Sequence, residues 1–226
     1  MNREATTVQL QVDREVSIHA GQVEVPGHIA VPRDAAGIVL FAHGSGSSRH
    51  SPRNRFVAER LHQYGFATLL FDLLTSEEEN VDARTGHFRF DIDFLSERLV
   101  ESSMWVHAQK ELQHMSVGYF GASTGAAAAL VAAARNPERV KAVVSRGGRP
   151  DMADQWLSSV QAPVLLIVGG NDTRVLAMND SARRNLRCSS ALETVEGASH
   201  LFEEPGALER VADLAGSWFR DHVQRG

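Results

Sequence analysis

Short apolar runs, each about the length of one β-strand, recur along the whole chain. They cover residues 38–42, 67–71, 116–120, 141–145, 164–168 and 191–195. The stretches between them are long enough for helices: residues 51–64 open on Ser-Pro, and residues 91–114 repeat apolar positions at helical spacing. Strands that alternate with helices predict a parallel sheet with helices on both faces.

The first part of the chain follows a different pattern. Between Glu15 and Val31, apolar and polar residues alternate as in a hairpin, with Ala20-Gly21-Gln22 as its turn. The expected fold is therefore α/β, a mostly parallel sheet with an antiparallel N-terminal edge. No shift in composition and no internal repeat marks a second domain, so we expect a single domain over residues 1–226.

Two further segments lack the strand pattern. Residues 75–90 are polar and contain Glu77, Glu78 and Glu79, so we expect a solvated loop that could partly cover a site. Residues 124–135 are rich in alanine, which predicts a helix that packs very close to the sheet.

Composition and charge narrow the classes of partner. The chain carries 23 Lys and Arg against 28 Asp and Glu, a net charge of -5, so we expect neither nucleic acid nor anionic lipid as a partner. No apolar stretch approaches the roughly 20 residues that span a bilayer. The segment from Met1 to Gln11 lacks the features of a secretory signal, and Cys188 is the single cysteine. These observations predict a cytoplasmic protein.

One motif carries a candidate nucleophile. Gly121-Ala122-Ser123-Thr124-Gly125 matches the G-x-S-x-G elbow, in which a sharp strand-to-helix turn exposes the serine hydroxyl. The motif follows one predicted strand and opens the alanine-rich helix, which is the setting that it requires. A tight structural turn is the alternative interpretation.

A serine needs a base to accept its proton and an acid to orient that base. Asp172 follows the strand at 164–168, at the sheet edge where ligands of open α/β sheets bind. The alternative role for Asp172 is to cap the next helix. His200 follows the strand at 191–195, so the chain order is Ser, Asp, His, as in α/β-hydrolases. Hydrolysis should fail in acid as His200 becomes protonated.

The segment His43-Gly44-Ser45-Gly46-Ser47-Ser48 follows the first predicted parallel strand. A dinucleotide-binding fingerprint would need a third glycine at Arg49, so that interpretation fails. We expect instead an oxyanion hole, formed by the backbone N–H groups of Ser45 and Thr124. His43 is expected to support this loop by hydrogen bonding.

Taken together, these segments resemble the α/β-hydrolase superfamily, and in size the dienelactone-hydrolase-like branch. The resemblance covers essentially the whole chain and rests on HGSGSS, LLFDLL, GASTG, LLIVGGND and GASHLFEEPG. It implies an α/β-hydrolase fold with Ser123, Asp172 and His200 as the triad, and no metal or organic cofactor. The chain departs from dienelactone hydrolases at the nucleophile, where those enzymes usually carry cysteine.

The resemblance also bears on the substrate. Many larger relatives insert a helical lid, but the short segment between Ser145 and Pro163 leaves no room for one, which favours small soluble esters. Further candidate substrate contacts are His43 and several residues in loops after strands. The arginines could bind a carboxylate-bearing substrate, although surface ion pairs are the alternative. These loop candidates are Arg49, Arg84, His87, Arg146 and Arg149.

The function predicted from the sequence is hydrolysis of small carboxylic esters through an acyl-enzyme. Four alternatives stay open: a thioesterase, a lactone hydrolase, an acyltransferase or perhydrolase, and a non-catalytic binding module on the same scaffold. The expected partner is a small-molecule ester, and the oligomeric state stays open.

Overall fold

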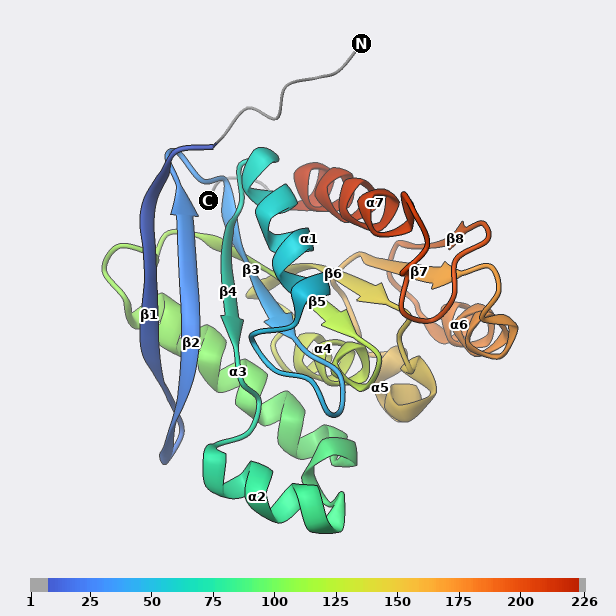
Figure 1. Ribbon diagram of the computed structural model, residues 1–226, viewed down its shortest axis with the longest axis horizontal. Helices are drawn as coiled ribbons and strands as arrows, with labels where there is room; N and C mark the ends of the chain where they lie inside the picture. The colour runs from blue at the N-terminus through green and yellow to red at the C-terminus, as the bar shows by residue number, and fades with distance from the viewer. Residues whose placement is uncertain (1–7, 224–226) are drawn as a thin grey trace.

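A computed structural model describes residues 8–223, and an eight-stranded sheet forms its centre (Figure 1). Most of the segment Met1 to Gln11, considered above for a signal, lies outside the described residues. The strands are β1 (Leu10–Ala20), β2 (Val23–Pro32), β3 (Gly37–Ala42), β4 (Ala67–Phe71), β5 (Ser116–Ala122), β6 (Val140–Arg146), β7 (Val164–Gly169) and β8 (Ser190–Val195).

The strands lie in the order β1-β2-β4-β3-β5-β6-β7-β8. β2 runs antiparallel to both β1 and β4, and every other pair is parallel. The predicted mixed sheet with an antiparallel N-terminal edge is therefore confirmed. Every residue of β3, β4 and β7 is buried, which explains why these strands are continuous apolar runs.

Helices cover both faces of the sheet and form two separate apolar cores (Figure 1). α1 (Pro52–Gln63) and α7 (Ala207–His222) pack on one face, where the rings of Phe41 and Phe120 lie 4.9 Å apart. α3 (Ile92–Ala108), α4 (Thr124–Arg135), α5 (Asp154–Leu157) and α6 (Thr173–Asn185) pack on the other, together with the short η2 (Pro150–Ala153). In α4, residues 124–133 are buried, because small side chains let this helix approach the sheet closely.

The structure corrects the expected loop at 75–90. This segment contains α2 (Ser76–Thr85) and the short η1 (Phe88–Phe90). Thr75 and Glu78 form a capping box, in which the Thr75 hydroxyl accepts from Glu78 N–H and the Glu78 carboxylate accepts from Thr75 N–H. The acidic run lies in the first turn, where the helix dipole favours negative charge. The T-x-x-E spacing is visible in the sequence and would have indicated this helix.

The parallel strands around the sheet centre end at the same level. Ala42 lies opposite Gly121, and Ala122 lies opposite Arg146 in the neighbouring strand. The loops that follow β3, β5 and β6 therefore leave the sheet side by side. Every candidate for nucleophile and oxyanion hole lies in one of these loops or in the helix that follows.

Candidate active site

Ser123 adopts a backbone conformation that a residue with a side chain rarely takes. It joins β5 to α4 with φ 52° and ψ −120°, a strain of about 1–3 kcal/mol that the surrounding structure must hold. A Cβ at Gly121 would lie 2.4 Å from Ala126 Cα, and one at Gly125 would lie 2.2 Å from Ala42 O. Both glycines of the motif are therefore required for α4 to start this close to the sheet.

The end of β6 and the loop after it hold the Ser123 backbone from two sides. Ser123 N–H donates to Arg146 O at 3.2 Å, and Arg149 N–H donates to Ser123 O at 3.1 Å. Between these two contacts, Gly147 lies against the imidazole of His200, where a Cβ would be 3.5 Å from Nδ1. One short loop thus contacts both the candidate nucleophile and the candidate base.

Asp172 and His200 are in direct contact. His200 Nδ1 lies 2.6 Å from Asp172 Oδ2, so an ionised carboxylate accepts from Nδ1–H and leaves Nε2 free to accept a proton. Asp172 is also the N-cap residue of α6, yet its side chain makes no capping hydrogen bond. The Asp172 side chain is 16% exposed and that of His200 is 41% exposed. The acid is thus sheltered while the imidazole reaches the surface.

Further hydrogen bonds fix the loop that carries His200. Asn171 donates from its backbone N–H to Ala198 O at 2.9 Å and from Nδ2 to Gly197 O at 2.7 Å. The Glu204 carboxylate accepts from Ser199 N–H at 3.0 Å, and this bond lowers the pKa of Glu204. The loops of the acid and the base are therefore tied to each other by backbone contacts.

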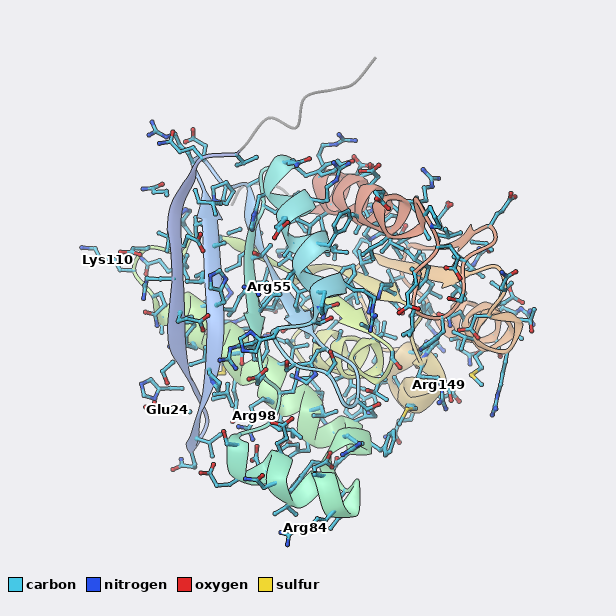
Figure 2. All side chains as sticks on the ribbon, viewed as in Figure 1. Glu24, Arg55, Arg84, Arg98, Lys110 and Arg149 are labelled. Atoms are coloured by element: carbon cyan, nitrogen blue, oxygen red, sulfur yellow. The ribbon has the colours of Figure 1, made fainter. Side chains whose placement is uncertain are left out.

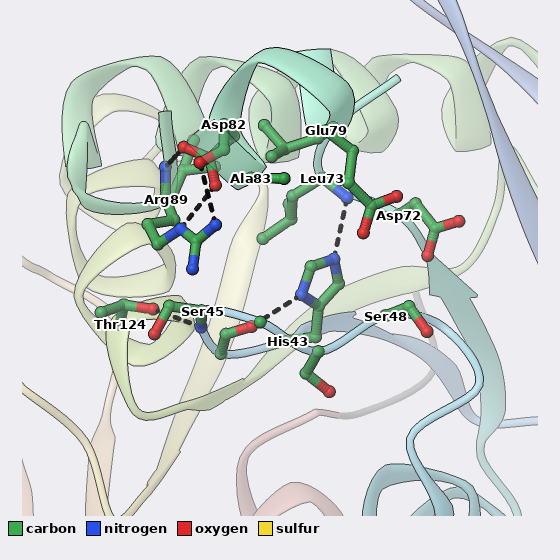
Figure 3. Close-up of a pocket in the computed structure, with 15 residues that line it drawn as sticks. His43, Ser45, Ser48, Asp72, Leu73, Glu79, Asp82, Ala83, Arg89 and Thr124 are labelled. Atoms are coloured by element: carbon green, nitrogen blue, oxygen red, sulfur yellow. Dashed lines mark hydrogen bonds and ion pairs between the residues drawn. The ribbon is translucent and has the colours of Figure 1, made fainter. Parts of the chain in front are cut away.

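The loop after β3 approaches the elbow from the opposite side. A Cβ at Gly44 would lie 3.2 Å from the Ser123 Cβ. Ser45 N–H donates to Thr124 Oγ1 at 2.9 Å (Figure 3). The two residues expected to form the oxyanion hole are thus adjacent, but the Ser45 N–H is engaged with a side chain of the protein.

His43 is half-buried and uses both ring nitrogens for backbone contacts (Figure 3). Leu73 N–H donates to Nε2 at 3.0 Å, so Nδ1 carries the proton that is donated to Gly44 O at 3.0 Å. Burial lowers the pKa of His43, which keeps the imidazole neutral in this arrangement. The structure thus gives His43 a bracing position between two loops.

A cavity opens beside Ser45 and Thr124, under α2 (Figure 3). Its volume is about 100 Å³, and Leu73 and Arg89 are among the residues that line it. This volume holds a small chemical group and is smaller than the pockets that enclose drug-sized ligands. The corrected segment 75–90 thus forms one wall of the cavity.

Arg89, which the sequence analysis did not single out, is held in this cavity by a buried carboxylate. Asp82 accepts from Arg89 Nε at 2.6 Å and from Phe88 N–H at 2.7 Å. Burial by itself would raise the pKa of Asp82, but these hydrogen bonds outweigh it and lower the pKa. Nε and Nη2 of Arg89 both bond to Asp82, whereas Nη1 has no partner within residues 8–223 and faces Ser45 and Thr124 across the cavity (Figure 3). Only the fold of α2 and η1 places this residue here, and no sequence motif marks it.

Most of the other arginines proposed from the sequence are engaged elsewhere. Arg49 forms an ion pair with Asp72 and a longer one with Glu15 at 3.6 Å. Arg149 pairs with Asp151 at 2.7 Å. Neither Arg49 nor Arg149 lines the cavity, so the surface ion pairs weighed above describe both of them.

Arg84 and His87 also lie outside the cavity. Arg84 is exposed and points away from the body of the protein at the far end of α2 (Figure 2). His87 is exposed, its ring packs edge-on against Phe88, and it does not line the cavity. That His87 contacts the substrate therefore stays a prediction that this cavity does not support.

Arg146 differs from the others because it is buried and has no acidic partner among residues 8–223. It is 8% exposed, and its Nη1 has no hydrogen-bond partner in the described part of the chain. Burial, followed by the nearby charge of Arg53, lowers the pKa of Arg146 to about 10. The side chain lies outside the cavity, although its backbone carbonyl accepts from Ser123 N–H.

The chain belongs to the dienelactone hydrolase family, whose pattern matches residues 25–218. It is 58% identical to a dienelactone hydrolase from Anabaena variabilis of known crystal structure, over 96% of this chain and 100% of that one, with a TM-score of 0.93. Est1E from Butyrivibrio proteoclasticus shares the fold at 14% identity, over 92% of this chain and 98% of that one, with a TM-score of 0.76.

A longer protein is also similar in sequence. A Mycobacterium tuberculosis protein, provisionally named a phosphoribosyl transferase, is 57% identical over 211 residues. The match covers 93% of this chain but 47% of that protein. The chain therefore spans about half the length of the curated relatives that it matches.

Membrane-spanning helices and metal-binding clusters are both absent from residues 8–223. The helices in this part of the chain are too short or too polar to cross a membrane. Over the same residues, no cluster of three or more His, Cys, Asp or Glu side chains is arranged to hold a metal ion.

Proposed function

We propose that this protein is a serine hydrolase that cleaves small, soluble carboxylic esters. The observation that carries the proposal is the Asp172–His200 hydrogen bond of 2.6 Å, together with the strained elbow at Ser123, since segment 146–149 contacts both His200 and the Ser123 backbone. The dienelactone hydrolase family supports hydrolase chemistry, and the ester as substrate is our inference. We further propose that residues 1–226 act as a single domain.

In the proposed reaction, His200 Nε2 accepts the hydroxyl proton of Ser123 as Oγ attacks the ester carbonyl carbon. The carbonyl oxygen becomes an oxyanion in the tetrahedral intermediate. When the C–O bond to the alcohol breaks, the imidazolium of His200 gives its proton to the leaving oxygen. A water molecule then attacks the acyl carbon as His200 Nε2 accepts its proton. The C–Oγ bond to Ser123 breaks, His200 returns the proton to Oγ, and the carboxylic acid leaves. Asp172 stays ionised and stabilises the imidazolium throughout.

The cavity under α2 supports a short acyl group. With a volume of about 100 Å³, it has room for a short acyl group and none for a long lipid chain. The unpartnered Arg89 nitrogen favours esters that carry a negative group in the acyl part. The proposed substrates thus extend from neutral acetates to monoesters of short dicarboxylic acids.

The longer mycobacterial protein has one part that matches this chain and another part that does not. We assign hydrolase chemistry to the part of that protein that matches this chain. Phosphoribosyl transfer, which its name states, is assigned to the rest of its length. The two activities would then belong to separate folded units.

A fluorophosphonate probe tests the nucleophile. We expect a covalent adduct on Ser123, located by mass spectrometry, and no adduct in Ser123→Ala. Esters from acetate to octanoate should be hydrolysed at rates that fall as the acyl chain lengthens, and a hemisuccinate ester tests the preference for a negative group. Absence of both adduct and turnover would contradict the proposal and favour a binding module.

The remaining alternatives differ from an esterase in measurable ways. Competition between matched oxygen esters, thioesters and lactones identifies the acyl donor that gives the largest kcat/KM. Titration with an alcohol or with peroxide, followed by product analysis, separates transfer from hydrolysis. Water should remain the main acceptor.

A further inference from the structure

The Ser45 backbone donor does not point into empty space. It donates to Thr124 Oγ1 at 2.9 Å, so this oxygen occupies the acceptor position that an oxyanion would otherwise take (Figure 3). Thr124 is 3% exposed and lines the cavity. Within residues 8–223, its hydroxyl accepts this bond but has no acceptor of its own for the O–H proton.

The position of the Thr124 side chain is restricted. Thr124 is the first residue of α4, and the start of this helix is fixed because Gly125 packs directly against the Ala42 and His43 carbonyls. A β-branched side chain in a helix has few favourable χ1 rotamers. The hydroxyl therefore stays close to Ser45 N–H, next in sequence to the candidate nucleophile.

We propose that the Thr124 hydroxyl is itself a donor of the oxyanion hole. It would donate its O–H to the oxyanion while accepting from Ser45 N–H, and the Thr124 backbone N–H would supply the second direct contact. This inference rests on the proposed serine hydrolase function. The step transfers no proton and breaks no covalent bond.

Elementary hydrogen-bond chemistry supports this arrangement. A hydroxyl that accepts a hydrogen bond becomes a better donor, because the two bonds polarise each other. Its contact with the substrate strengthens as the carbonyl oxygen gains negative charge, and such a contact accelerates the reaction. Ser45 would then act through Thr124, as a positioning residue and not as a direct donor.

The opposite role for the same hydroxyl is a plug that must leave before Ser45 N–H can bind the oxyanion. The two roles predict opposite effects of Thr124→Val, which keeps the shape and the backbone N–H but removes the hydroxyl. Loss of a donor lowers kcat, whereas loss of a plug leaves kcat unchanged or raises it.

The test compares wild type, Thr124→Val and Thr124→Ser on one short ester. For Thr124→Val we expect kcat to fall on the order of 100-fold with little change in KM. The inhibition constant of an alkylboronic acid, which forms a tetrahedral anion on the serine, should rise in parallel. Thr124→Ser should recover most of kcat because it restores the O–H.

Thr68→Val is the matched control. Thr68 is also a buried threonine, but its hydroxyl contacts His62 at 2.8 Å, away from the elbow. We expect it to affect stability and leave kcat and boronate inhibition unchanged. Should Thr124→Val fail to fold, Thr124→Ala gives the same comparison.

The outcomes separate this inference from the proposed function. Wild-type kcat in folded Thr124→Val, or a fall in kcat without weaker boronate inhibition, overturns the donor role while the serine hydrolase stands. A wild-type protein that is neither labelled by the fluorophosphonate nor active on esters overturns both.

Discussion

At the scale of single residues, burial decides the protonation of two histidines that the proposed chemistry does not use as bases. His43 and His62 both have a pKa below the ordinary value, and burial is the largest cause for each. Both also contact polar groups that fix their orientation: His43 bonds to Leu73 N–H, and His62 bonds to Thr68 Oγ1. Neutral histidines inside the fold should make it sensitive to acid.

His62 allows this sensitivity to be measured. Burial lowers its pKa to about 4, and Asp13 and His28 act on it with opposite signs, whereas a free imidazole has a pKa of about 6.5. As pH falls below about 6.5, His62 becomes protonated in the unfolded chain, whereas in the folded protein it stays neutral until about pH 4. The free energy of unfolding should therefore decrease across this window.

The expected slope from this one group is at most about 1.4 kcal/mol per pH unit. Urea unfolding of His62→Gln at several pH values between 4 and 7 should show a flatter profile than the wild type, with some slope remaining from His43. The exposed His50 provides the control, because His50→Gln should leave the profile unchanged. Equal slopes for wild type and His62→Gln would contradict the prediction.

At the scale of elements, α6 links the three parts of the candidate site. Its N-cap is Asp172, which bonds to His200. Two turns later, the buried Asn179 donates from Nδ2 to Gly148 O at 3.0 Å. The residues on either side of Gly148 contact His200 and the Ser123 backbone, so one helix supports the loop that separates base and nucleophile.

Replacing Asn179 should therefore affect both catalysis and stability. Asn179→Leu removes the hydrogen bond to Gly148 O, which lowers the stability of the folded protein. It also removes a buried Oδ1 that has no partner within residues 8–223, so part of that loss of stability is offset. We expect destabilisation of about 1–3 kcal/mol and a fall in kcat on the order of 10-fold from misplaced groups.

Asn185, an exposed residue at the end of the same helix, is the matched control. Asn185→Ala should retain the wild-type kcat and the wild-type rate of fluorophosphonate labelling. Chemical denaturation of both variants gives the change in stability. A folded Asn179→Leu protein with wild-type kcat would show that the loop keeps its position without this contact.

At the scale of the whole molecule, one sheet separates two apolar cores that share its strands. Trp105 and Trp156 pack against one core, and Trp218 packs against the other. Because each strand contributes side chains to both cores, neither core can form without the sheet. The two faces should unfold together.

Tryptophan fluorescence can test this cooperativity. In Trp218→Phe the remaining indoles report on one face, and in a Trp105→Phe, Trp156→Phe double variant Trp218 reports on the other. We expect the same denaturant midpoint from both faces and from far-UV circular dichroism, as in a two-state transition. Separate midpoints would show that the described chain contains two units.

Local patterns were enough to predict most elements of this fold. The strands and the covering helices follow from apolar runs and helical spacing, because burial on a pleated or helical surface imposes a period on the sequence. The prediction of a loop at 75–90 was also wrong for a local reason. The capping box of Thr75 and Glu78 stabilises the start of a helix there, although the composition is polar.

The sequence by itself determined the order of strands and helices, the elbow at Ser123, and the chain order of Ser123, Asp172 and His200, because each depends on neighbours along the chain. Only the tertiary structure decided which groups from distant segments of the chain contact each other. It directs Ser45 N–H to Thr124 Oγ1 and pairs Arg49 with Asp72. Such contacts join residues that are far apart in sequence, so their partners depend on how the loops pack and on which groups lose water.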